Sequence, residues 1–211
     1  MIKEATENEK ESLTRLYTED VRALDAVEHL LDVSRASMDK IIFSFDVFTM
    51  KDVNGFIKSV TDTLSLQAKE KNISVDIQLS NPSQNSIKID KTKILLAIET
   101  LFENTLLYTP NGGSIKIVTE EKQSSFFFSV SDTGIGILDK DKSKIFSQFF
   151  RGENARHKFP DGFGVGLYIV KIFVEKHDGK VWFTSKEGVG TTFTFKLPMI
   201  TNPTESFFEK I

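Results

Sequence analysis

Two glycine clusters follow one another along the chain, and the first begins with a carboxylate. Residues 131–137 place Asp132 just before Gly134 and Gly136, at the end of the apolar stretch 126–130. An ionised carboxylate only accepts hydrogen bonds, so Asp132 can bind a ligand edge that carries a donor. Glycine has no Cβ, so Gly134 and Gly136 allow the backbone to approach that ligand closely. A turn Asp before glycine is the plainer alternative.

The second cluster, residues 161–167, opens a predicted helix over 164–177 and contains Gly162, Gly164 and Gly166. Free N–H groups and the positive end of the helix dipole make such a helix start a site for phosphate. A flexible loop that only needs glycines is the alternative. A third glycine segment follows at residues 188–193.

Periodicity predicts the elements that position these clusters. Residues 73–79 alternate between apolar and polar side chains, as a half-buried strand does, and residues 126–130 suit a short buried strand. Helices are expected after the capping box of Thr49 and Asp52 and after Asp90 as N-cap. Further strands are predicted at 41–48, 87–89, 114–120, 125–131, 180–185 and 191–197. The fold class is therefore α+β, a two-layer sandwich in which helices back a mixed sheet.

Four segments lie outside this sandwich pattern. Residues 9–38 carry an apolar stripe at helical spacing, which fits either a helix packed on the domain or half of a helical hairpin that pairs with a second chain. Beyond residue 138 a short helix is predicted at 142–149. Residues 152–161 are polar and aperiodic, as in a lid that orders with ligand. Residues 199–211 form a tail with few folding signals.

Composition limits the class of protein. The 211 residues carry a net charge of -3 and include 19 Phe and no Cys. Near-balanced charge gives no reason to expect nucleic acid as a partner, and no apolar run approaches the roughly 20 residues of a membrane span. We therefore expect a cytoplasmic chain, with a parent protein that can be membrane-anchored.

Five ordered motifs together resemble the ATP-binding catalytic domain of sensor histidine kinases, in the superfamily shared with DNA gyrase and heat-shock chaperones. Residues 31–35 also resemble the end of the second helix of the family's dimerisation domain. The five motifs are the N box (103–110), the first glycine box (131–137), the F box (144–152), the second glycine box (161–167) and the third (188–193). The resemblance implies a Bergerat-type ATP-binding fold with ATP and Mg²⁺. It divides the chain into a partial dimerisation helix (1–40), the ATP-binding domain (41–198) and a tail (199–211).

The resemblance also assigns roles to individual residues. Asn104 becomes the Mg²⁺ ligand, Asp132 the acceptor for the adenine amine, and Arg151 a phosphate contact. A structural Asn104, a solvent-exposed Arg151 and a plain strand Thr191 are the alternatives from the residues alone. The implied ATP-binding residues are Asn104, Tyr108, Asp132, Gly134, Gly136, Ile137, Arg151, Gly162, Gly164, Val165, Gly166, Leu167 and Thr191.

Two positions depart from the family pattern. Thr100 stands where kinases usually carry Asn and gyrase-like relatives a Glu base, which disfavours a self-contained ATPase. Leu107 stands where a Lys often lies near the phosphates, so charge stabilisation of the γ-phosphoryl group is reduced. Both departures favour a rival hypothesis, a degenerate module that binds nucleotide or dimerises without catalysis. A serine-directed kinase of the anti-sigma type shares the fold, but the match at residues 31–35 argues against it.

The phosphoacceptor is the remaining question. His29, His157 and His177 are the only histidines, and none lies in a family-like acceptor motif. We therefore expect phosphotransfer to a histidine outside this chain, on a dimerisation helix, with a response regulator downstream. In the intact protein the N-terminal helix is expected to form a homodimer.

Overall fold

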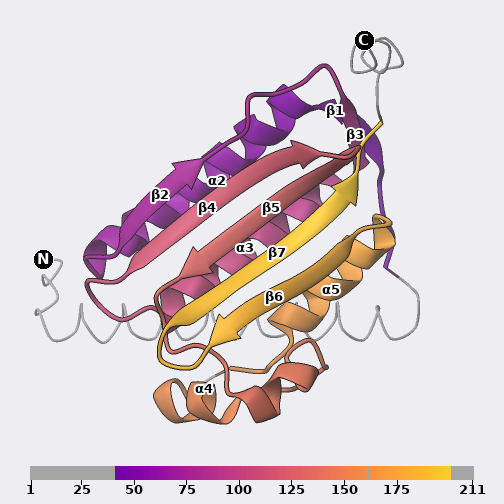
Figure 1. Cartoon of the computed structure of the whole chain (residues 1–211). Coiled ribbons are helices and arrows are strands. Elements are labelled where there is room, and N and C mark those ends of the chain that lie inside the picture. Colours follow the sequence, from indigo (N-terminus) through magenta and orange to yellow (C-terminus); the bar gives the residue numbers. More distant parts are fainter. Residues whose placement is uncertain (1–40, 161, 201–211) are drawn as a thin grey trace, which may run out of the picture. The chain divides into compact units, whose positions relative to one another are not determined.

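The computed structural model describes residues 41–160 and 162–200 (Figure 1). The predicted dimerisation helix at 1–40, His29, Asp161 and residues 201–211 of the tail lie outside the described residues. Every helix and strand described below follows Ile42, where the second of the chain's two units begins.

Five strands form the main sheet in the order β2-β4-β5-β7-β6. β2 runs parallel to β4, whereas all other neighbours are antiparallel, so the sheet is mixed as expected. A second sheet pairs β1 with β3. The strand bounds are β1 Asp46–Thr49, β2 Ser74–Gln78, β3 Ser86–Ile89, β4 Ser114–Lys122, β5 Ser125–Asp132, β6 Lys180–Lys186 and β7 Gly190–Pro198.

Three helices, α2 (Met50–Glu70), α3 (Lys91–Tyr108) and α5 (Gly166–Lys176), cover one face of the sheet (Figure 1). Both predicted helix starts are confirmed. Thr49 and Asp52 exchange the two hydrogen bonds of a capping box at the start of α2, and the Asp90 carboxylate accepts the Lys93 N–H at 3.1 Å at the start of α3. These caps satisfy N–H groups that a helix start leaves without partners.

The core lies between these helices and the sheet. Alternate residues of β5, namely Phe126, Phe128 and Val130, are buried with Phe195 of β7 and Phe173 of α5. The apolar stretch 126–130 is therefore buried on one face only.

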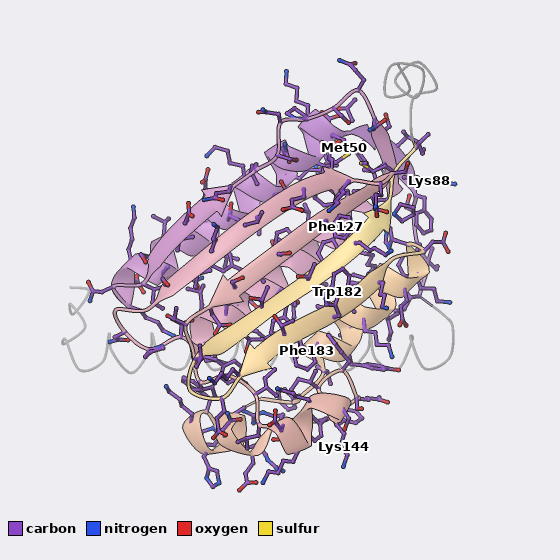
Figure 2. The ribbon with its side chains drawn as sticks, in the orientation of Figure 1. Met50, Lys88, Phe127, Lys144, Trp182 and Phe183 are labelled. Carbon is purple, nitrogen blue, oxygen red and sulfur yellow. The ribbon has the colours of Figure 1, made fainter. Side chains whose placement is uncertain are left out.

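The opposite face of the sheet carries the intervening side chains, including the aromatic pair Phe127 and Trp182 (Figure 2). Their ring centroids lie 6.3 Å apart, and both side chains are half-buried.

Several predicted boundaries were wrong. Residues 41–45 form no strand, because only Asp46–Thr49 pairs with β3. The helix expected at 142–149 is a 3₁₀-helix at Asp139–Lys144, and the segment expected to be irregular contains a short helix, α4 (Glu153–Lys158). α5 begins at Gly166 instead of Gly164, since Gly164 has a positive φ of 67°. In the helix predicted at 164–177, helical spacing places Tyr168 and Ile172 on the inward face, and the structure shows both half-buried.

Candidate functional site

Asp132 ends β5 at the edge of the core, and its carboxylate is held through one oxygen. Oδ1 accepts the backbone N–H of Gly134 at 2.8 Å and that of Thr191 at 3.1 Å. Burial raises the pKa of Asp132 to about 6, although both hydrogen bonds act in the opposite direction. Among the described residues, nothing donates a hydrogen bond to Oδ2, so this oxygen can accept a donor from a ligand.

Gly134 and Gly136 are required by the packing of the protein chain itself. A Cβ on Gly134 would lie 2.7 Å from the Tyr108 carbonyl oxygen. A Cβ on Gly136, where φ is +64°, would lie 2.1 Å from the Lys186 carbonyl oxygen. Contacts this short exclude any side chain, so these glycines let the first glycine segment approach α3 and the β6–β7 turn.

Asn104 lies on α3 with its amide oriented by its own helix. Nδ2 donates to the Thr100 carbonyl oxygen at 2.9 Å, which leaves Oδ1 as the free end of the amide. A Cβ on Gly166 would lie 2.9 Å from Thr100 Cγ2 and 3.9 Å from Asn104 Nδ2. The structure therefore brings Asn104 beside the start of α5, as the N box and the second glycine box together predict.

The start of α5 presents N–H groups without a side-chain cap. Val165 occupies the N-cap position and makes no capping hydrogen bond through its side chain. The first backbone bond of the turn runs from the Ile169 N–H to the Val165 carbonyl oxygen. Gly166 and Leu167, both expected to bind ATP, belong to this first turn. The geometry suits an anion at the helix start.

Arg151 is engaged with the backbone of the segment before α5. Its guanidinium donates to the carbonyl oxygens of Phe159, of Pro160 at 2.5 Å and of Gly162 at 3.3 Å. A Cβ on Gly164 would lie 2.9 Å from Arg151 Cγ. A phosphate contact by Arg151 stays a prediction, and it would require the guanidinium to exchange these carbonyl oxygens for phosphate.

The remaining predicted side chains lie around Asp132. Tyr108 is half-buried, and its ring meets Phe159 edge to face with centroids 5.7 Å apart. Ile137 and Thr191 are buried, and Thr191 is tied to the site by the N–H that it donates to Asp132. A carboxylate, apolar side chains, an oriented amide and a helix start thus surround one region of the domain.

Comparison with known proteins identifies this arrangement. Residues 89–201, more than half of the chain, match the family described as the histidine kinase-, DNA gyrase B- and HSP90-like ATPases. The chain belongs to this ATPase family. The matched residues contain Asn104, Asp132 and all three glycine segments.

Individual relatives of this ATPase domain are sensor kinases. The sensor-like histidine kinase SenX3 of Mycobacterium tuberculosis (strain H37Rv) is 30% identical over 187 residues, covering 88% of this chain and 44% of SenX3. The chain thus spans less than half the length of that relative.

Solved structures agree with this relationship. The catalytic domain of histidine kinase ThkA, in a nucleotide-free form, matches 75% of this chain and all of that domain with a TM-score of 0.64 and 28% identity. ThkA in complex with the response regulator TrrA matches 93% of this chain and 53% of that chain, with a TM-score of 0.69 and 26% identity.

Sequence reasoning missed three residues that shape this ATPase site. Ser185 accepts the Ile137 N–H at 2.9 Å. Asn154 of α4 donates to the Gly136 carbonyl oxygen at 3.0 Å, and the buried Asp141 accepts the Glu153 N–H at 2.9 Å. Ser185 could have been noticed, because it ends the strand predicted at 180–185 and Thr191 begins the next, at 191–197, so a hairpin of the two brings them together. Asn154 and Asp141 have no local signature.

The two described histidines have different surroundings. His177 is buried; its Nε2 accepts the Asp90 N–H at 2.8 Å, and its Nδ1 donates to the Phe173 carbonyl oxygen at 2.6 Å. Because Nε2 accepts a hydrogen bond, it carries no proton, so the imidazole is neutral and both nitrogens are used. Burial lowers the pKa of His177, which acts in the same direction. His157 is exposed on α4.

The described residues contain no group of three or more His, Asp or Glu side chains that could hold a metal ion. They also contain no helix with the length and apolar character needed to cross a membrane.

Proposed function

We propose that this site binds ATP with Mg²⁺, and that the chain is the catalytic portion of a sensor histidine kinase. The observation that carries the proposal is the Asp132 carboxylate, in which Oδ1 is occupied by two backbone N–H groups and Oδ2 is left to accept the adenine amine. Ile137, Tyr108 and Thr191 supply the surroundings of the base. Gly134 and Gly136 let the backbone of the first glycine segment lie close to α3 and the β6–β7 turn.

The polyphosphate would lie at the start of α5. The N–H groups of Gly166 and Leu167 point out of the helix start there, and Gly162, Gly164 and Val165 form the approach to it. Arg151 would add positive charge once it leaves the carbonyl oxygens that it now binds.

Asn104 fits the role of a magnesium ligand. Its Nδ2 is committed to Thr100, so a neutral carbonyl oxygen remains, and magnesium is a hard cation that takes oxygen ligands. Magnesium typically uses one or two protein ligands together with phosphate oxygens and water. When bound, the ion neutralises charge on the phosphates.

The reaction would be phosphoryl transfer to an imidazole nitrogen. The nitrogen forms a bond to the γ-phosphorus while the bond to the bridging oxygen breaks, and ADP leaves. We place the acceptor histidine on a dimerisation helix outside this chain. His177 is unsuited to the role, because it is buried with both nitrogens engaged.

The wider setting follows from the relatives. ThkA has been solved with a response regulator, and we propose that the parent of this chain likewise passes its phosphoryl group to one. We also propose that the parent dimerises through its N-terminal helix and that this portion works in the cytoplasm.

Titration with a non-hydrolysable ATP analogue, with and without Mg²⁺, tests binding. Labelled ATP with the chain alone, and with a separately supplied dimerisation domain that carries the helix pair, tests transfer. We expect acid-labile label only when that domain is present. Label on His29 of the isolated chain would contradict the placement of the acceptor.

A second function is favoured by Thr100 and Leu107. Thr100 is buried with its methyl group toward Gly166, so it offers no carboxylate base. Leu107 supplies no cation. Nucleotide binding without transfer to any acceptor would assign the chain to the non-catalytic module.

A further inference from the structure

One hydroxyl joins the first glycine segment to the hairpin that carries the third. Ser185 lies near the end of β6, opposite Thr191 of β7. Its Oγ accepts the Ile137 N–H at 2.9 Å and donates to the Gly190 carbonyl oxygen at 3.0 Å. Thr191 Oγ1 lies 2.9 Å from Ser185 Oγ. Thr191 must be the donor of this bond, since the single hydroxyl hydrogen of Ser185 is already used. The hydroxyl therefore uses its donor and both of its acceptor positions.

The partners of Ser185 adjoin Asp132. Thr191 donates its backbone N–H to Asp132 Oδ1 at 3.1 Å. Gly190 packs directly on the same residue, because a Cβ there would lie 2.0 Å from the Asp132 carbonyl oxygen. On the other side, Ile137 continues the glycine segment that starts at Asp132. Ser185 thus ties together the two chain segments between which the carboxylate is held.

We propose that Ser185 is a positioning residue for adenine recognition, an inference that rests on the proposed ATP site. Its hydroxyl holds Thr191 and Ile137 at a fixed separation, so that the Thr191 N–H stays on Asp132 Oδ1 and Oδ2 faces the exocyclic amine. Without the hydroxyl, one of the two donors that fix the carboxylate is released, and the carboxylate can rotate. The base specificity of the site then depends on a residue that does not touch the nucleotide.

The hairpin itself should survive loss of this hydroxyl. The Gly188 N–H donates to the Ile135 carbonyl oxygen at 2.9 Å, a backbone link that no side-chain substitution removes. Seven register pairs also join β6 to β7, from Lys180 with Lys196 to Lys186 with Gly190.

The first test compares ATP with ITP, which lacks the exocyclic amine. Calorimetric titration of the whole chain with each nucleotide should show that Ser185→Ala weakens ATP binding about tenfold and leaves ITP binding nearly unchanged. Ser185→Thr, which keeps the hydroxyl, should restore most of the preference for ATP. Ser129→Ala is the matched control, because Ser129 pairs with the Thr194 hydroxyl at 2.9 Å on the open face of the same sheet. Ser129→Ala should keep the ratio of ATP affinity to ITP affinity of the unsubstituted chain.

A second readout needs no nucleotide. The amide resonances of Gly134 and Thr191 should shift as Asp132 titrates, since both N–H groups donate to its Oδ1. In Ser185→Ala, the Thr191 amide should lose this response while the Gly134 amide keeps it. Should Ser185→Ala fail to fold, Ser185→Cys retains the volume with weaker hydrogen bonding and undergoes both measurements.

The outcomes separate this inference from the proposed function. If the unsubstituted chain prefers ATP and Ser185→Ala retains both the ATP-to-ITP ratio and the Thr191 response, the inference is overturned while the proposed function stands. If the unsubstituted chain binds neither nucleotide, the proposed function fails, and the inference fails with it.

Discussion

Asp132 is the residue on which the proposed nucleotide binding depends most directly. Two backbone N–H groups hold Oδ1, while burial disfavours the charged form and raises the pKa to about 6. The carboxylate is thus oriented by the fold before any ligand arrives, and its charge is sensitive to mildly acid conditions.

We expect Asp132→Asn to weaken adenine-nucleotide binding by about 1–3 kcal/mol, since the acceptor for the amine is lost. Calorimetric titration measures the change. Asp139→Asn is the matched control, because it removes the same charge from an exposed position nearby, where Asp139 pairs with Lys142 at 2.6 Å. Equal affinities of the unsubstituted chain and Asp132→Asn would show that this carboxylate does not take part in nucleotide binding.

The same residue predicts a pH dependence of binding. The amine needs an ionised acceptor, and the folded carboxyl has a pKa of about 6. Nucleotide affinity should therefore be full above that pH and fall as the pH drops through it. The Asp132→Asn variant serves as the reference, because its profile lacks the titration of this carboxyl and keeps that of every other group of protein and nucleotide. Parallel profiles for the two proteins would contradict the assignment.

At the scale of elements, α4 and the start of α5 differ in how they are held. None of the six residues of α4 is buried. The helix is attached by single contacts, including Asn154 with Gly136 and Glu153 with Asp141. α5, in contrast, buries Ile169, Val170, Phe173 and Val174.

We expect amide exchange in Glu153–Lys158 to be fast without nucleotide and slower with it, because few buried contacts protect α4. Hydrogen-exchange mass spectrometry with and without an ATP analogue measures this difference, and the amides of α2 supply the internal control. High protection that nucleotide leaves unchanged would make the segment a fixed loop, contrary to the lid prediction.

His177 joins the far ends of two helices that carry site residues. It lies just after α5, accepts the N–H of Asp90 at the start of α3, and packs against Phe43 and Phe45 with ring centroids 5.7 and 4.9 Å away. Asp90 also accepts the Ser44 N–H at 2.9 Å. The segment before β1 is therefore anchored on both α3 and α5.

This anchor predicts a stability change in acid. The pKa of His177 is lowered below its ordinary value of 6.5 by burial, so the unfolded chain binds more protons than the folded chain in this range. The contribution of His177 to the free energy of unfolding should be constant above about that pH and fall below it, by at most about 1.4 kcal/mol per pH unit. The raised pKa of Asp132 contributes with the opposite sign in acid, so the contribution of His177 is the difference between the unsubstituted chain and a His177 variant. Urea unfolding at neutral and mildly acid pH measures it. His157→Gln should keep the slope of the unsubstituted chain, whereas His177→Gln should lose the part of the slope in which stability falls with acid. An unchanged slope in His177→Gln would contradict the assignment.

For the whole molecule, the two-layer arrangement places the core on one face of the sheet. Phe128 is fully buried and stacks on Phe195 with centroids 5.1 Å apart. Its neighbour Phe127 stands on the open face beside Trp182.

Phe128→Ala should therefore cost about 3–5 kcal/mol of stability through lost burial and a residual cavity. Phe127→Ala, the same substitution one residue away, should cost clearly less. Chemical denaturation measures both. Equal losses would mean that the open face of the sheet is covered in solution.

Local chemistry in the sequence was enough to predict much of this domain. The helix caps at Thr49, Asp52 and Asp90 join residues only three positions apart. Their roles could therefore be predicted from the local sequence. Alternation predicted β2, and the first two glycine segments marked the end of β5 and, to within two residues, the start of α5. Where local signals were weak, at residues 138–165, the predicted helix limits were wrong.

Tertiary structure alone decided which distant groups meet. Ile137 and Ser185 are 48 residues apart, and Asp90 and His177 are 87 apart. Such contacts arise because the sheet order β5-β7-β6 and the packing of α3 beside α5 bring those segments together. A hydrogen bond between distant residues has no periodicity and no local signature. For that reason the backbone partners of Arg151, the role of Ser185 and the anchor at His177 became visible only in the folded chain.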